Sequence, residues 1–160
     1  MTGSPLNRRW TAFTLLIYWS CILLGLCIPW LATITVDMLK HDQSFAQALH
    51  QLRLHLFAPG YNLFLIGLLN AAPFLLFAIF ALLHMGFAPL ENRRLRGRRC
   101  AGILVTAVGL IGFSAWTHLM TLWHPDAQGA LAYLFLPFAL LGIMPISYAL
   151  GRGMGTLIFR

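Results

Sequence analysis

Six histidines and one serine–histidine pair are the residues of this sequence whose types suggest chemistry. Ser114 and His118 stand four residues apart, which places them on one face of a helix. A hydrolytic triad also needs an acid that orients the histidine, and residues 100–125 contain no Asp or Glu. None of the histidines has the H-x-x-x-H or H-E-x-x-H spacing of helical metal sites. We therefore expect no catalytic residue, no metal site and no enzymatic activity.

Cofactor binding and transport are disfavoured by the positions of the polar residues. A pair of haem ligands must lie at one depth, but His84 and His118 are expected near opposite ends of their helices. Proton and ion pathways normally use buried ionisable side chains, and the apolar stretches of this chain contain no Asp, Glu, Lys or Arg. The sequence predicts no cofactor and a packed bundle in place of a conduit.

Four long uncharged stretches must position these residues. Residues 10–36, 54–90, 100–125 and 127–151 contain no charged side chain, and each exceeds the roughly 20 residues that cross a bilayer. Backbone groups in hydrocarbon must be satisfied within their own segment, so each stretch is expected to be helical. The first stretch is too long for the apolar region of a signal peptide. We predict an all-α integral membrane four-helix bundle, a single transmembrane domain over residues 1–160, with helices over residues 10–36, 61–84, 100–123 and 129–150.

The charged residues predict the topology. Basic residues gather near both ends of the chain and in the second loop, whose arginines are Arg93, Arg94, Arg96, Arg98 and Arg99. Asp37, Asp42 and Asp126 stand in the other two loops. The positive-inside rule then places both termini and the arginine-rich loop in the cytoplasm, as for a bacterial inner-membrane protein. The arginines are expected to set topology and attract anionic lipid headgroups, and no nucleic-acid partner is expected.

A short amphipathic helix is predicted over residues 44–57 in the first outer loop. Ser44 and Gln47 fit a capping box. Apolar residues then follow at helical spacing, namely Phe45, Ala48, Leu49, Leu52 and Leu56. This helix lies either on the outer leaflet or folded over the bundle, as a simple lid or as a docking surface.

The remaining polar and small residues are candidates for contacts between helices. Asn70 and Pro73 lie in the middle of the second helix, and Gly102, Thr106 and Gly109 form a small-residue face on the third. Ser114, Thr117 and His118 form a polar stripe on the same helix. Each residue either holds this bundle together or binds a partner.

Three further features bear on the ends and joints of the helices. Pro29 is expected to leave a carbonyl that a neighbouring helix must satisfy. The short loop at residues 124–128 predicts that the third and fourth helices are antiparallel neighbours. The glycine-rich residues 151–155 are expected to end the last helix and begin a flexible tail.

The run NAAPFL at residues 70–75, followed by an apolar helix and the basic run RRLRGRRC at residues 93–100, resembles the four-helix inner-membrane immunity proteins of A-type pore-forming colicins. The resemblance covers about residues 70–141. It implies a protein that binds a pore-forming bacteriocin or antibacterial effector within the inner membrane and blocks pore opening. The predicted partner-binding residues are Asn70, Pro73, Gly102, Thr106, Gly109, Ser114, Thr117 and His118. The alternative is a structural accessory subunit of a larger inner-membrane complex.

Overall fold

The chain folds into helices joined by short segments. The computed structural model describes residues 5–86, 93–125 and 129–158, and these ranges contain five α-helices and no strand. The helices are α1 (Pro5–Lys40), α2 (Phe45–His55), α3 (Leu63–Gly86), α4 (Arg93–Trp123) and α5 (Gly129–Ile158). The all-helical prediction is confirmed.

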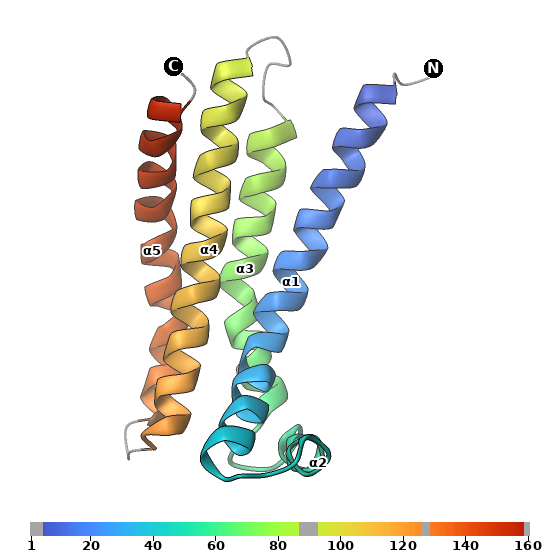
Figure 1. Ribbon diagram of the computed structural model, residues 1–160, viewed down its shortest axis with the longest axis vertical. Coiled ribbons are helices and arrows are strands. Elements are labelled where there is room, and N and C mark those ends of the chain that lie inside the picture. Colours follow the sequence, from blue (N-terminus) through green and yellow to red (C-terminus); the bar gives the residue numbers. More distant parts are fainter. Residues whose placement is uncertain (1–4, 87–92, 126–128, 159–160) are drawn as a thin grey trace.

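The four long helices run side by side, alternately up and down, with α1 leaning away from the others toward its N-terminal end (Figure 1). Within the described ranges, four helices are long and apolar enough to cross a membrane. Helices suit that role because every interior backbone group bonds within its own segment. These features indicate a multi-pass membrane protein whose α1 start and α5 end lie at the same end of the bundle.

The helices pair in a fixed pattern. The most extensive contacts join α4 to α5 and α1 to α3, and α1 also contacts α4 while α3 contacts α5. The short connection before α5 thus makes α4 and α5 antiparallel neighbours, as predicted. At the C-terminal end of α1, the Lys40 ammonium donates to the carbonyl of Trp123 and so joins the C-terminal ends of α1 and α4.

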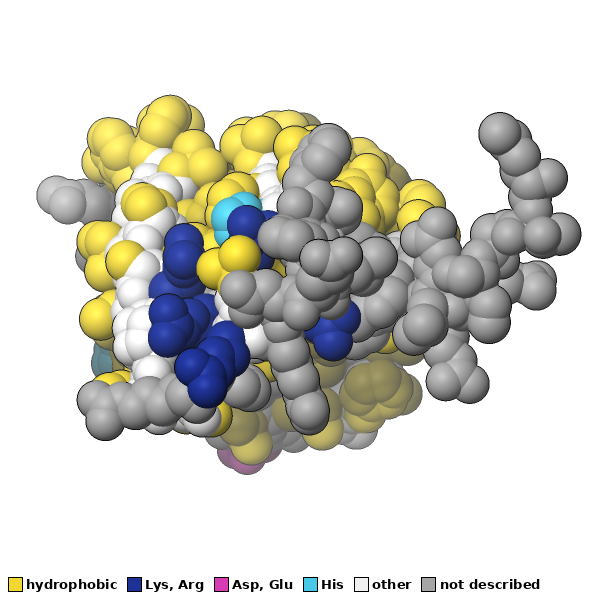
Figure 2. All heavy atoms as spheres, turned by 90° about the horizontal axis from the view of Figure 1, so that it is seen from above, with side chains coloured by type: hydrophobic (Ala, Val, Ile, Leu, Met, Phe, Trp, Pro, Cys, Tyr) yellow, Lys and Arg dark blue, Asp and Glu magenta, His cyan; other side chains and the backbone are white. Residues whose placement is uncertain are grey.

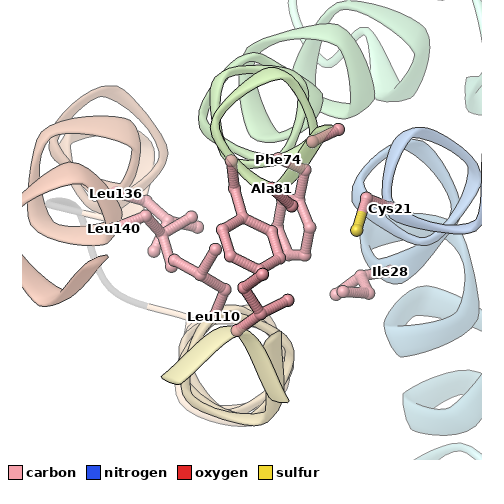
Figure 3. Close-up of a cluster of buried hydrophobic side chains, with 10 residues drawn as sticks. Cys21, Ile28, Phe74, Ala81, Leu110, Leu136 and Leu140 are labelled. Atoms are coloured by element: carbon pink, nitrogen blue, oxygen red, sulfur yellow. The ribbon is translucent and has the colours of Figure 1, made fainter. Parts of the chain in front are cut away.

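Apolar side chains from all four long helices meet in the middle of the bundle (Figure 3). Phe74 and Phe77 of α3 are almost completely buried, as are Leu110 of α4 and Leu140 of α5. Cys21 and Ile28 of α1 belong to the same cluster. Because lipid tails are as apolar as these side chains, close packing and interhelical hydrogen bonds, and not the hydrophobic effect, hold such helices together.

Three helices extend well beyond their predicted ends. Helix α1 runs from Pro5 to Lys40, so Asp37, which was expected in the outer loop, lies in its last turn. Helix α4 begins at Arg93, so the arginines expected in a loop lie in its first two turns. Arginine and leucine are good helix formers, and one glycine does not stop the helix. Helix α5 continues through Gly151 and Gly155 to Ile158, so the predicted helix stop and flexible tail are wrong. These glycines lie against the backbone of α4, and this packing keeps the segment helical.

Helix α2 begins with the predicted capping box. The backbone N–H of Gln47 donates to the Ser44 hydroxyl at 3.4 Å, and the backbone N–H of Ser44 donates to the Gln47 side-chain carbonyl at 2.8 Å. Ala48 and Leu52 are buried, and α2 contacts α1. Phe45 stays exposed, so only part of the apolar face is covered by the rest of the chain.

Candidate functional site

Asn70 forms the central polar contact of the bundle. Its side-chain amide donates to the Gly25 carbonyl of α1 at 2.6 Å, and its carbonyl accepts from the Ser114 hydroxyl of α4 at 2.8 Å. Proline at position 29 has no amide hydrogen, so the Gly25 carbonyl lacks its helical partner four residues on. Asn70 therefore supplies the hydrogen bond that Pro29 removes, and joins three helices with one side chain.

The close approach of α1 and α3 makes this contact possible. A methyl group added at Gly25 would lie 2.9 Å from the Phe74 side chain and 3.0 Å from the Ala71 Cα. Pro73, which lies on α3 between Ala71 and Phe74, is also buried. Gly25 therefore lets the backbone of α1 come within reach of the Asn70 amide.

The polar stripe of α4 faces the bundle interior. Beyond Ser114, the Thr117 hydroxyl donates to the Phe113 carbonyl of its own helix at 2.9 Å. His118 is buried, and its ring stacks on Tyr133 of α5 with centroids 5.2 Å apart. The His118 Nε2 atom is buried without a hydrogen-bond partner. The stripe thus makes contacts within and between the helices of this chain.

The small-residue face of α4 is occupied by α5. A methyl group at Gly102 would lie 2.6 Å from the Tyr148 ring, and one at Gly109 would lie 2.8 Å from the Ser147 hydroxyl. Thr106 is buried between these glycines and donates to the Gly102 carbonyl at 2.8 Å. In the isolated chain, the residues predicted to bind a partner therefore lie inside the bundle.

A different surface is available on α5. Its outward face carries large exposed side chains such as Phe138 and Ile146. Two glycines, Gly142 and Gly153, lie on the same face, and a methyl group at either one would have no atom within 4 Å. The sequence signal for this surface is the separation of Gly142 and Gly153, which is close to three helical turns and places both glycines on one side of the helix.

A pocket of about 620 Å³ opens at the end of the bundle opposite the arginines, between the start of α3, the end of α4 and the start of α5. It is lined mainly by apolar side chains, together with Tyr61, Thr121 and Tyr133. The Tyr61 and Tyr133 hydroxyls are 3.5 Å apart. Burial raises the pKa of the Tyr61 phenol above its usual value.

His84 and His118 lie near opposite ends of the bundle. His84 hydrogen-bonds to the Tyr148 hydroxyl at the arginine-rich end, far from His118. Among the residues that the structure describes, no group of three His, Cys, Asp or Glu side chains could hold a metal ion.

The arginines of α4 lie at one end of the bundle, where Figure 2 shows basic side chains gathered beside a histidine. Arg94, Arg96, Arg98 and Arg99 all belong to the N-terminal part of α4. The Arg99 guanidinium donates to the His84 carbonyl at 3.1 Å and so joins α4 to the end of α3. Arg93 begins the helix, but its side chain lies outside the described part, as does Asp126 in the opposite loop.

A comparison of the chain with known protein families, curated proteins and solved structures finds no match. The fold and surfaces define its class as a multi-pass helical membrane protein with a packed interior and apolar outward helix faces.

Proposed function

We propose that this protein is an immunity protein that binds a pore-forming bacteriocin or antibacterial effector within the bacterial inner membrane and blocks pore opening. The resemblance at residues 70–75 and 93–100 supplies the class of partner. Such a role requires helix-packing surfaces and no reacting group, which agrees with the composition of the four spans.

The observation that carries this proposal is the outward face of α5. Glycines on a membrane helix let a second helix approach its backbone closely, and such approaches drive helix association in lipid. Gly142 and Gly153 provide this property on a face that none of the other described helices covers. A helical hairpin of the toxin would pack along this face before the pore opens.

The proposed orientation agrees with the route of a toxin. With the arginine-rich end in the cytoplasm, α2 and the pocket near Tyr61 face the outer side, where the toxin arrives. The partner would first contact this end and then pack along α5, so that specificity comes from complementary surfaces.

The test is protection of sensitive cells. Cells that express the chain are exposed to the toxin encoded beside its gene, and survival is compared with that of cells expressing Gly142→Leu/Gly153→Leu. We expect the wild type to protect and the double variant to lose most of the protection, because leucines would hold the partner helix away. Gly112→Leu is the matched control, because Gly112 is equally open but lies on α4. Wild-type cells that die as readily as cells without the chain would refute the proposal.

A constitutive accessory subunit would use the same open face of α5, since any permanent neighbour could pack on it. Purification distinguishes the two functions. An immunity protein is expected to be stable alone in detergent, whereas an accessory subunit should co-purify with fixed partners in the absence of toxin.

A further inference from the structure

Two helices that carry arginines are in close contact at the basic end of the bundle. Arg98 belongs to α4 and Arg152 to α5. A methyl group at Gly155 would lie 2.9 Å from the Arg98 Cα, and one at Gly102 would lie 3.0 Å from the Arg152 Cγ. The two helices therefore touch at the positions where these arginines leave the backbone.

Tyr148 and His84 form an aromatic floor beside the arginines. The Tyr148 hydroxyl bonds to the His84 ring, and the two rings lie edge to face with centroids 5.3 Å apart. The Arg152 guanidinium carbon is 6.0 Å from the Tyr148 ring centroid. Arg99 bonds to the carbonyl of His84. Three helices thus hold Arg99 and Arg152 near one pair of rings.

The acidic residues that the structure describes, Asp37 and Asp42, lie at the end of α1 and just beyond it, opposite the start of α4. The Nε atoms of Arg98 and Arg99 are buried without a hydrogen-bond partner. A buried N–H of a charged group is costly unless an acceptor satisfies it, so an anionic acceptor at these two atoms would stabilise the folded chain.

The depth of the cluster matches lipid phosphate. Trp123 suits one membrane interface, and Arg99 lies 24 residues earlier on α4. This distance is about 36 Å at 1.5 Å per residue, against a hydrocarbon layer of about 30 Å and about 40–45 Å with the headgroups. Leu150 and Met154 are exposed next to Arg152 and offer an apolar surface for acyl chains.

We propose that Arg98, Arg99 and Arg152 form a binding site for the phosphate group of an anionic phospholipid. Arginine suits this ligand because its planar fork donates two parallel hydrogen bonds to phosphate oxygens. The bound phosphate would join α4 to α5 at the end where the closest glycine contacts lie. This inference does not depend on the proposed immunity function.

The experiment titrates the full chain, purified in a neutral detergent, with short-chain phosphatidylglycerol or phosphatidylcholine. Native mass spectrometry measures both dissociation constants. We expect phosphatidylglycerol to bind about tenfold more tightly, a difference of about 1.4 kcal/mol, because phosphatidylcholine carries a trimethylammonium cation beside its phosphate and the arginines repel that cation. Equal dissociation constants for the two lipids would overturn the proposal. This comparison requires only the wild-type chain.

Variants locate the site. Arg98→Gln/Arg152→Gln should remove the preference for phosphatidylglycerol, whereas Arg53→Gln/Arg94→Gln, which loses the same charge, should keep it. An equal loss of the preference for phosphatidylglycerol in both double variants would mean a general charge effect and would overturn the proposed site. Arg152→Lys keeps the charge and should still weaken binding, because lysine lacks the planar fork. Full displacement of the lipid by an equal concentration of inorganic phosphate would overturn the lipid as the ligand.

Discussion

At the scale of single residues, the contact between Asn70 and Gly25 explains how a proline is tolerated within α1. Pro29 frees the Gly25 carbonyl, and the Asn70 amide satisfies it across the interface with α3. The two residues therefore act as a pair, although they lie on different helices. Ser114 completes the contact by donating to the Asn70 carbonyl.

A double-mutant cycle tests this pairing. Asn70→Ala should destabilise the bundle by about 1–2 kcal/mol, because interhelical hydrogen bonds in membranes contribute about 0.6–2 kcal/mol each. In the Pro29→Ala background the cost should be smaller, since the new amide hydrogen can bond to the Gly25 carbonyl. Reversible unfolding in mixed micelles measures each free energy. Equal costs in both backgrounds would contradict the pairing, and Ser114→Ala is the control that removes one bond but not the other.

The sequence predicted that a neighbouring helix must satisfy a carbonyl freed by Pro29, but it did not predict that Asn70 does so. A proline within a membrane helix implies that a neighbour must satisfy the freed carbonyl, and Asn70 stood out as the most central polar residue. Their pairing depends on which helices are adjacent and on the rotation of each about its axis. A sequence that is apolar on every side of a helix contains little information on that rotation.

At the scale of helices, the contact between α4 and α5 depends on glycines along its whole length. Gly102 and Gly109 of α4 meet Tyr148 and Ser147, while Gly151 meets the α4 backbone. The sequence does not indicate the last of these contacts, because a glycine after an apolar helix commonly marks the end of that helix. Glycine has a low intrinsic helix propensity, but close packing outweighs this preference.

Two glycine substitutions on α5 should have different effects on the free energy of unfolding. Gly151→Ala places a methyl group 2.6 Å from the Ala101 carbonyl oxygen and must push the helices apart, at a cost of about 1–3 kcal/mol. Gly142→Ala has open space around it and should leave stability unchanged or raise it by up to about 1 kcal/mol. Unfolding in mixed micelles measures both. Equal stability of the two variants would show that the close approach is not required.

At the scale of the whole molecule, the positive-inside rule predicts that α2 faces the outside and the start of α4 faces the cytoplasm. The alternation of four long helices agrees with placing these two segments on opposite sides. The number of spans followed from the lengths of the uncharged stretches. The open face of α5 and the pocket near Tyr61 did not, because both depend on how the helices pack.

Cysteine labelling tests the orientation. In a chain whose three cysteines are replaced, His50→Cys on α2 should react with a membrane-impermeant maleimide in intact spheroplasts. Arg94→Cys on α4 should react only after lysis. The reverse pattern would place the arginines outside and remove the proposed route of the toxin.

The central claim is that a partner packs on the outward face of α5, and photocrosslinking within the membrane tests it most directly. A benzophenone side chain replaces either Phe138 of α5 or Val108 of α4, which are 67% and 70% exposed. After addition of the toxin encoded beside the gene, the account predicts a crosslink to the toxin from position 138 and little or none from position 108. Equal crosslinking from both positions, no crosslink from position 138, or a crosslink from it to a resident protein without toxin would contradict the account.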